Sequence, residues 1–163
     1  MKDRIVVSAV CVFDDAGRLL TVRKRGTAMF MHPGGKPEPG ESAVQAAARE
    51  LAEEVGIVID PLDLALMGVW IADAANEAAT DIEATVFLAP GTWEARPAAE
   101  IAEIRWLDLD LLAGGASLPQ DLAPLLTDHV LPVLAGTPPE PGQPEAGRPG
   151  PGQPEPRRLE HTD

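Results

Sequence analysis

Residues Gly35 to Ile57 read GKPEPGESAVQAAARELAEEVGI, and the interpretation of the whole chain depends on this stretch. Ser42 is followed three residues later by Gln45, which is the pattern of a capping box at the start of a helix. Apolar residues then recur at helical spacing up to Gly56, which stands where a glycine commonly ends a helix. We therefore predict an amphipathic helix over residues 42–55.

The polar face of this helix carries Glu50, Glu53 and Glu54 at positions i, i+3 and i+4. Carboxylates at this spacing repel one another, which destabilises an isolated helix by roughly 0.2–0.5 kcal/mol per pair. A bound cation would reverse this effect, and Mg²⁺ prefers oxygen ligands and leaves coordination positions for phosphate. The pattern thus indicates either a metal site or a solvated acidic surface, because acidic helix faces are common.

Composition limits the classes of ligand. The 163 residues include 26 acidic and 13 basic side chains, giving a formal net charge of −13, which disfavours binding to nucleic-acid polymers. A phosphate-bearing small molecule would need a metal ion to invert the local field. No apolar run of membrane-spanning length and no secretion signal is present, and the single cysteine, Cys11, lies in an apolar run. We predict a cytoplasmic protein, not associated with membranes, in which Cys11 is a small buried hydrophobe.

Apolar runs and alternation predict strands on both sides of the helix. The expected strands are 5–13, 18–25, 64–71, 82–88 and 101–107. The first is apolar on both faces, as in a central strand that is covered on two sides. In the second, Arg23 and Arg25 project from the face opposite Leu20 and Val22, either as a charged edge or as a functional pair.

The remaining segments are a second helix, connections and a tail. A helical pattern covers 122–133, with Pro132 expected to end or kink the helix and His129 expected on its apolar stripe. His32, in the apolar connection 26–34, is expected to cap a turn or pack. Residues 1–136 are expected to form one domain. Residues 137–163 are rich in Pro and Gly, which predicts a disordered, partly polyproline II tail.

The opening stretch resembles the Nudix box. The matching positions are Gly35, Glu41 and the run Arg49-Glu50-Leu51-Ala52-Glu53-Glu54-Val55-Gly56-Ile57. The resemblance extends to about residue 134 in the order of elements. It implies an α/β protein of the Nudix fold, with a mixed β-sheet sandwiched between α-helices.

The resemblance also implies an activity, namely hydrolysis of a nucleoside diphosphate linked to another group, with Mg²⁺ or sometimes Mn²⁺. In such enzymes the metal ions neutralise the diphosphate and activate the water that attacks phosphorus. A short single domain favours a nucleoside triphosphate pyrophosphatase, including one for oxidised nucleotides, acting as a monomer or homodimer. The alternatives are an ADP-ribose or nucleotide-sugar pyrophosphatase, a nucleotide-binding module without catalysis, and an interaction protein that works through the tail.

Individual residues receive roles from the resemblance. The expected metal ligands are Glu50, Glu53, Glu54, Glu38 and the backbone carbonyl of Gly35. The expected catalytic residues are Glu53, which binds metal or deprotonates water, together with Glu50, Glu54, Arg49 and Glu41, the last two as supports of the loop and helix. The expected substrate-binding residues are Arg23, Arg25, Gly34 and Gly35. The alternative bases are Glu100 and Glu103.

Overall fold

The computed structural model describes residues 2–136. Its strands are β1 (Asp3–Cys11), β2 (Leu19–Lys24), β3 (Gly34–Gly35), β4 (Ala65–Asp73), β5 (Thr80–Leu88) and β6 (Ile101–Leu107). Its helical segments are α1 (Ala43–Val55), η1 (Pro61–Asp63), α2 (Leu109–Ala113), η2 (Leu125–Val130) and α3 (Leu131–Leu134).

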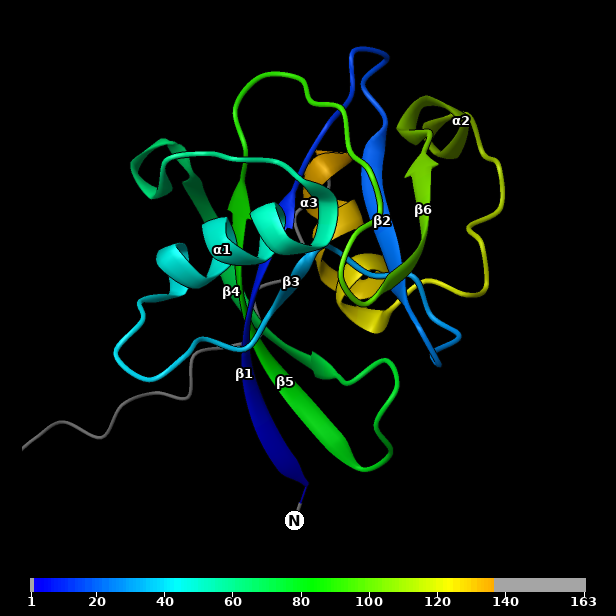
Figure 1. Ribbon diagram of the computed structural model, residues 1–163. Coiled ribbons are helices and arrows are strands. Elements are labelled where there is room, and N and C mark those ends of the chain that lie inside the picture. Colours follow the sequence, from blue (N-terminus) through cyan, green and yellow to red (C-terminus); the bar gives the residue numbers. More distant parts are fainter. Residues whose placement is uncertain (1, 137–163) are drawn as a thin grey trace, which may run out of the picture.

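The main sheet is mixed and lies between helices. Its strand order is β3-β1-β5-β4, with β1 parallel to β5 and the other neighbours antiparallel. Strands β2 and β6 form a separate antiparallel pair. Helix α1 covers one face of the main sheet, and η2 with α3 covers the other (Figure 1). The predicted fold class is therefore confirmed.

Strand β1 is the central element, as its apolar sequence predicts. It lies between β3 and β5, and its second half is buried on both faces, including Cys11, which is 0% exposed. Burial raises the pKa of the Cys11 thiol to about 12, so this residue is an inert apolar side chain. The first half of the strand differs from the prediction, because Val6 is 51% exposed on a part of the sheet that α1 does not reach.

Helix α1 begins and ends where its capping signals predict. The Ser42 side chain accepts a hydrogen bond from Gln45 N, and the Gln45 side chain accepts one from Ser42 N. At the other end Gly56 has a φ of 71°, and its N–H donates to the Leu51 carbonyl. Both ends of this helix therefore lie where the local sequence predicts them.

The C-terminal helix is less regular than the sequence suggests. It starts at Leu125, after Pro124, and its first part, η2, is a π-helix. Pro132 lies near the start of α3, which follows η2 without a break, so the proline does not end the helix. The predicted helix over 122–133 is therefore present over 125–134, and the expectation that Pro132 could end it was wrong.

Two further parts of the sequence prediction can be placed. The connection 26–34 contains the start of β3, a strand too short to produce a sequence pattern. The predicted tail, 137–163, lies outside the described residues. Within residues 2–136, none of the helices has the length and apolar character needed to cross a membrane.

Removal of the capping box provides a test of helix α1. We expect Ser42→Ala to lower the free energy of unfolding by about 1 kcal/mol, because Gln45 N loses its acceptor. Urea unfolding of the metal-free protein, followed by far-ultraviolet circular dichroism, measures the change. Ser117→Ala, at an exposed position, is the control. Equal free energies of unfolding of the two variants would contradict the role of Ser42 as the cap of α1.

Candidate active site

The centre of the site is the carboxylate of Glu54, which is 1% exposed near the C-terminal end of α1. Its Oε2 accepts a hydrogen bond of 3.0 Å from Gly34 N. Its Oε1 lies 3.1 Å from Lys24 Nζ, as an ion pair without hydrogen-bond geometry. Burial raises the pKa of Glu54 to about 7, although Lys24 and the Gly34 N–H act in the opposite direction. One buried acid thus joins the helix to the preceding loop and to β2.

Lys24 enters the site because of strand alternation. It projects from the same face of β2 as Leu20 and Val22, which pack beneath α1. Besides Glu54, its ammonium contacts Glu100 Oε1 at 3.0 Å and the Gly34 carbonyl at 3.3 Å. Burial lowers the pKa of Lys24, but the neighbouring carboxylates outweigh this effect, so the pKa is raised and the group stays charged. Lys24 was not among the site residues predicted from the sequence, although the same alternation points to it.

Arg49 gathers the other acids of the box. Its guanidinium makes two hydrogen bonds with Glu41, of 2.9 and 3.0 Å, and these raise its own pKa and lower that of Glu41. It also contacts Glu50 Oε1 at 3.1 Å and Glu53 Oε2 at 3.2 Å. The repulsion expected between the helix acids is therefore offset by a shared cation.

The glycines before α1 allow the backbone to approach its neighbours closely. A Cβ atom at Gly34 would lie 2.0 Å from the Ser8 carbonyl oxygen on β1. A Cβ atom at Gly35 would lie 2.2 Å from Glu50 Oε1. Only glycine leaves room for this loop between the sheet and the helix acids.

The loop 89–100 brings Glu100 to the site. The backbone N–H groups of Arg96 and Ala98 donate to the carbonyls of Val55 and Glu54, at the end of α1 that lacks internal partners. Ala99 then has a φ of 50°, an unfavourable left-handed conformation for alanine. Glu100 follows directly and pairs with Lys24.

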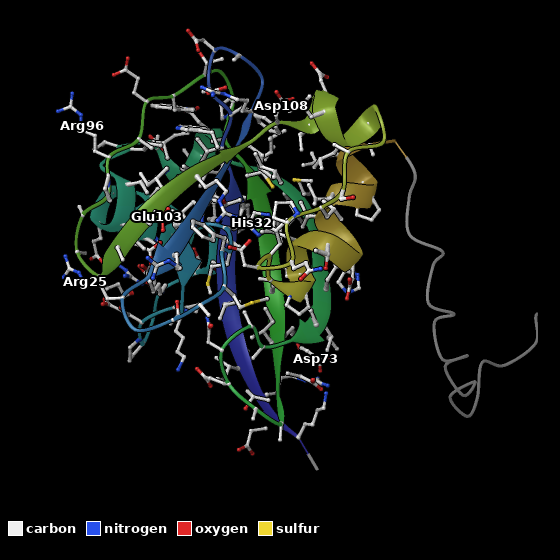
Figure 2. All side chains as sticks on the ribbon, turned by 90° about the vertical axis from the view of Figure 1, so that its right-hand side faces the viewer. Arg25, His32, Asp73, Arg96, Glu103 and Asp108 are labelled. Atoms are coloured by element: carbon white, nitrogen blue, oxygen red, sulfur yellow. The ribbon has the colours of Figure 1, made fainter. Side chains whose placement is uncertain are left out.

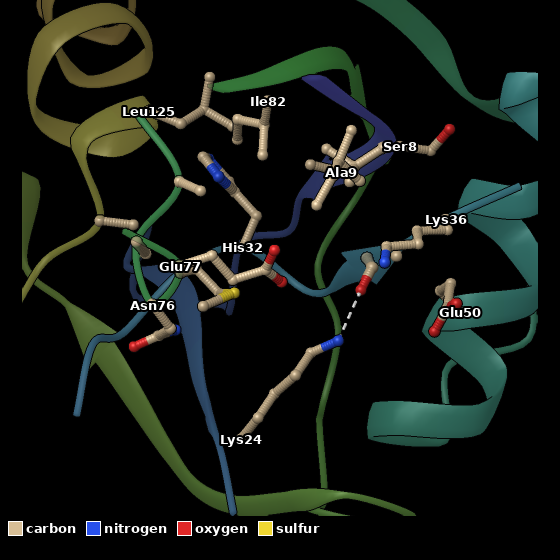
Figure 3. A pocket seen from close by; sticks show the side chains of 18 of the residues that line it. Ser8, Ala9, Lys24, His32, Lys36, Glu50, Asn76, Glu77, Ile82 and Leu125 are labelled. Atoms are coloured by element: carbon tan, nitrogen blue, oxygen red, sulfur yellow. Dashed lines mark hydrogen bonds between the residues drawn. The ribbon is translucent and has the colours of Figure 1, made fainter. Parts of the chain in front are cut away.

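Lys24, Gly34 and Glu100, which surround Glu54, line a cleft of about 500 Å³, whereas Glu54 itself is not one of its lining residues. Its polar part includes Lys24, Lys36, Glu50, Arg49 and Glu100. Its apolar part includes Ile5, Val7, Met31, Ile82 and Leu125. Figure 3 shows Lys24 reaching across the cleft toward the loop before α1, with Glu50 beyond it. The arrangement offers charge at one end and an aliphatic surface at the other.

Sequence comparison now supplies the family. Residues 2–128 match the model of the NUDIX domain. The chain belongs to the Nudix hydrolase family. The earlier prediction of a Nudix pyrophosphohydrolase is thereby confirmed at the level of the family, whose members generally use divalent metal ions.

Individual relatives differ in their named activities. Isopentenyl-diphosphate Delta-isomerase of Leifsonia xyli is 37% identical over 128 residues, covering 71% of this chain and 69% of that protein. Phosphatase NudJ of Escherichia coli K12 is 41% identical over 68 residues, which are 40% of this chain and 44% of NudJ. A MutT Nudix hydrolase from Burkholderia pseudomallei has a similar fold, with a TM-score of 0.61 at 24% identity, covering 83% of this chain and 98% of its own.

Some predicted site residues of this Nudix protein lie outside the cleft. Arg23 pairs with Glu103 at 3.1 Å and stacks its guanidinium 5.9 Å from the centre of the Phe30 ring, on the face of β2 opposite Lys24. Arg25 is exposed, and Figure 2 shows it at the margin of the molecule. Neither arginine lines the cleft, nor does Glu103. Their predicted roles in substrate binding and as an alternative base remain predictions.

The donor atoms of the Nudix helix suit a hard divalent ion. Within residues 2–136 no three acidic, histidine or cysteine side chains converge on one point. Nevertheless Glu54 Oε1 is buried without a hydrogen bond, and Glu50 and the Gly34 carbonyl face the same cleft end. These are oxygen donors of the kind that Mg²⁺ binds. Glu53 is 54% exposed and outside the cleft, whereas Glu38 is exposed at its rim.

His32 lies at the apolar end of the cleft. It is 3% exposed, and neither ring nitrogen has a hydrogen-bond partner among the described residues. Figure 3 shows its ring directed toward Leu125 and Ile82. Burial lowers the pKa of His32 from 6.5 to about 4, so the imidazole is neutral at pH 7. Packing, not turn capping, is therefore its role within the described residues.

The pKa of His32 predicts a pH-dependent stability. The folded protein resists protonation that the unfolded chain accepts, so stability is lost as the pH falls from 6.5 to about 4. We expect wild type to lose about 3 kcal/mol over this window relative to His32→Leu. Urea unfolding at a series of pH values measures the difference, with His129→Gln as the control that retains the wild-type slope. A constant difference between wild type and His32→Leu would contradict this prediction.

Proposed function

We propose that this protein is a Mg²⁺-dependent pyrophosphohydrolase that cleaves the diphosphate of a nucleoside triphosphate. The observation that carries the proposal is the buried Glu54 carboxylate, which contacts Lys24 and Gly34, two residues that line the charged end of the cleft together with Glu50. When bound there, Mg²⁺ would supply positive charge against the diphosphate and lower the pKa of water. Glu54 and Glu50 would hold the ion, with a backbone carbonyl of the loop as a further oxygen donor.

The chain's own cations would orient the phosphates. Lys24 and Lys36 line the cleft from β2 and from the loop after β3. An ammonium at each side of the diphosphate would offset its charge in a protein whose net charge is −13. Arg49, held by Glu41, would fix the position of Glu50 and so the geometry of the ion's carboxylate ligand.

A base must take the proton of the attacking water. Glu53 lies outside the cleft. Glu100 lines the cleft beside Lys24, whereas Glu103 does not. These positions favour Glu100 as the base over the two other glutamates named from the sequence.

The size of the cleft supports a substrate with one nucleoside. A volume of about 500 Å³ lies within the range of small-ligand sites. Asp73, Asn76 and Glu77, from the end of β4 and the following loop, line its far part and offer hydrogen-bonding groups to a base. An ADP-ribose or a nucleotide sugar would have to fit a second ring system into the same space.

A second candidate is hydrolysis of an alkyl diphosphate. Among residues 2–136 neither a Phe nor a Trp lines the cleft, and the chain has no Tyr, so the described lining offers no large aromatic ring to stack on a base. Its apolar end is aliphatic, and a relative is named for the substrate isopentenyl diphosphate. A short branched hydrocarbon would pack against such a surface.

A substrate panel with product identification tests the proposal. With Mg²⁺, we expect a nucleoside triphosphate to give a nucleoside monophosphate and pyrophosphate. ADP-ribose cleavage would give AMP and ribose phosphate, and an alkyl diphosphate would give the alkyl monophosphate and phosphate. We expect Glu54→Gln and Glu50→Gln to lower kcat by about 100- to 1,000-fold. Glu83→Gln, on the surface of β5, is the control. Wild-type turnover by both site variants, or no turnover of any diphosphate, would contradict the proposal.

The base is tested by comparing three conservative variants. We expect Glu100→Gln to lower kcat by about 100-fold or more and to remove the acidic limb of the pH–rate profile. Glu103→Gln should change kcat by less than about threefold, because its carboxylate faces Arg23 on the other side of β2. Loss of the acidic limb in Glu53→Gln, with Glu100→Gln unaffected, would assign the base to Glu53 instead.

A further inference from the structure

Lys24 has the contacts of a bound cation. Its ammonium lies 3.1 Å from Glu54 Oε1, 3.0 Å from Glu100 Oε1 and 3.3 Å from the Gly34 carbonyl oxygen. All three partners are oxygen atoms, two of them charged, and they come from three separate segments of the chain. Glu54 and the Gly34 carbonyl are also donors available to a divalent ion at this end of the cleft.

The pairing with Glu54 is the one of the three contacts that lacks hydrogen-bond geometry. Lys24 lies close to Oε1 but outside hydrogen-bond geometry, so this buried oxygen has charge compensation without a hydrogen bond. A buried acceptor in this state retains part of its desolvation cost, which a ligand directed at its lone pair would remove. A second cation can therefore bind Glu54 better than the lysine does.

Lys24 retains a carboxylate partner when it leaves Glu54. Its side chain is 24% exposed, and Glu100, which is 60% exposed, gives it a second carboxylate at the solvent side of the cleft. An ammonium that loses Glu54 keeps this partner and stays beside the space where the diphosphate would lie. Lys24 thus has a carboxylate partner both when it is paired with Glu54 and when it is released from Glu54.

We propose that Lys24 is an internal counter-ion that competes with the divalent metal ion for the Glu54 carboxylate. This inference rests on the proposed function, because it takes Glu54 as a metal ligand. Without metal, Lys24 compensates a charge that would otherwise be buried alone. With metal, Lys24 is released from Glu54 and remains at the cleft as a cation for the phosphates. The same residue then serves the stability of the free protein and the binding of substrate.

Metal binding measured without substrate tests the competition. We expect Lys24→Met to bind Mn²⁺ at least about tenfold more tightly than wild type in isothermal titration, because its competitor is gone. Lys36→Met is the matched control, since it removes one positive charge from the same cleft without a contact to Glu54. We expect it to tighten binding by less than about threefold. Equal effects of the two variants, or weaker binding by Lys24→Met, would overturn the inference.

Thermal unfolding gives a second readout that needs no activity. In EDTA, Lys24→Met should melt below Lys36→Met, because Glu54 is left without a cation. Mn²⁺ should raise the melting temperature of Lys24→Met by more than it raises that of wild type. If Lys24→Met does not fold in EDTA, Lys24→Gln, which keeps a hydrogen-bond donor, replaces it in both measurements. An identical metal-induced shift in wild type and variant would count against the competition.

These outcomes separate the inference from the proposed function. Mn²⁺ binding that tightens in Lys24→Met, in a protein that hydrolyses no diphosphate, would support the counter-ion role and contradict the proposed hydrolysis. Hydrolysis by wild type, with equal metal affinities in the two lysine variants, would support the proposed hydrolysis and contradict the counter-ion role. Absence of Mn²⁺ binding in wild type and both variants would overturn both.

Discussion

The constraint on which the site depends is the burial of one negative charge. Glu54 is 1% exposed, and an isolated ionised carboxylate in such an environment is strongly unfavourable. The chain compensates it with the Gly34 N–H on one side and the Lys24 ammonium on the other. These groups belong to the loop that precedes the helix and to strand β2. The need to satisfy one acid therefore holds three elements in place around the cleft.

The same logic explains how an acidic helix remains stable without a metal ion. The sequence predicts repulsion between carboxylates on one helix face, and a cation to relieve it. The structure supplies two side-chain cations, each with its own group of acids. Arg49 holds Glu41, Glu50 and Glu53, whereas Lys24 holds Glu54 and Glu100. The charges are thus divided between a cluster around a guanidinium and a cluster around an ammonium, and the second contains the most buried acid, Glu54. Because an ammonium is a compact charge on a flexible stem, the Lys24 cluster is the one that can exchange its cation.

The sequence predicts what local chemistry determines. Helix α1 was placed by its caps, and β6 by alternation, because both signals act between residues close in the chain. Strand β3 was not predicted, since two glycines give no sequence pattern and the strand forms only by pairing with β1. The π-helical form of η2 was not predicted either, because the spacing of apolar residues alone does not distinguish a π-helix from an α-helix.

The site residues show the same limit, namely that sequence patterns report only on residues close together in the chain. Glu50, Glu54 and Arg49 follow from the box, whose residues are neighbours on one helix. Glu100 became a candidate only through the family resemblance, because its approach depends on backbone hydrogen bonds between the loop 89–100 and the end of α1. Lys24 was overlooked in favour of arginines on the opposite face, although alternation with Leu20 and Val22 places it toward the helix.

The two ends of the cleft differ in the kind of interaction that they offer, and this difference bears on substrate selection. At the charged end, ion pairs and close glycine contacts fix atoms within narrow limits, so this end can recognise little besides a diphosphate with its cation. The aliphatic end is non-directional, with a stabilisation of about 25 cal/mol per Å² of apolar surface buried. A difference of one methylene group between ligands changes the free energy of binding by only about 1 kcal/mol at such a surface. His32 is the buried directional group there, and its ring nitrogens have no partner among the described residues. Strong discrimination at this end therefore requires a substrate that reaches this imidazole, or hydrogen bonds from the polar side chains of the loop after β4.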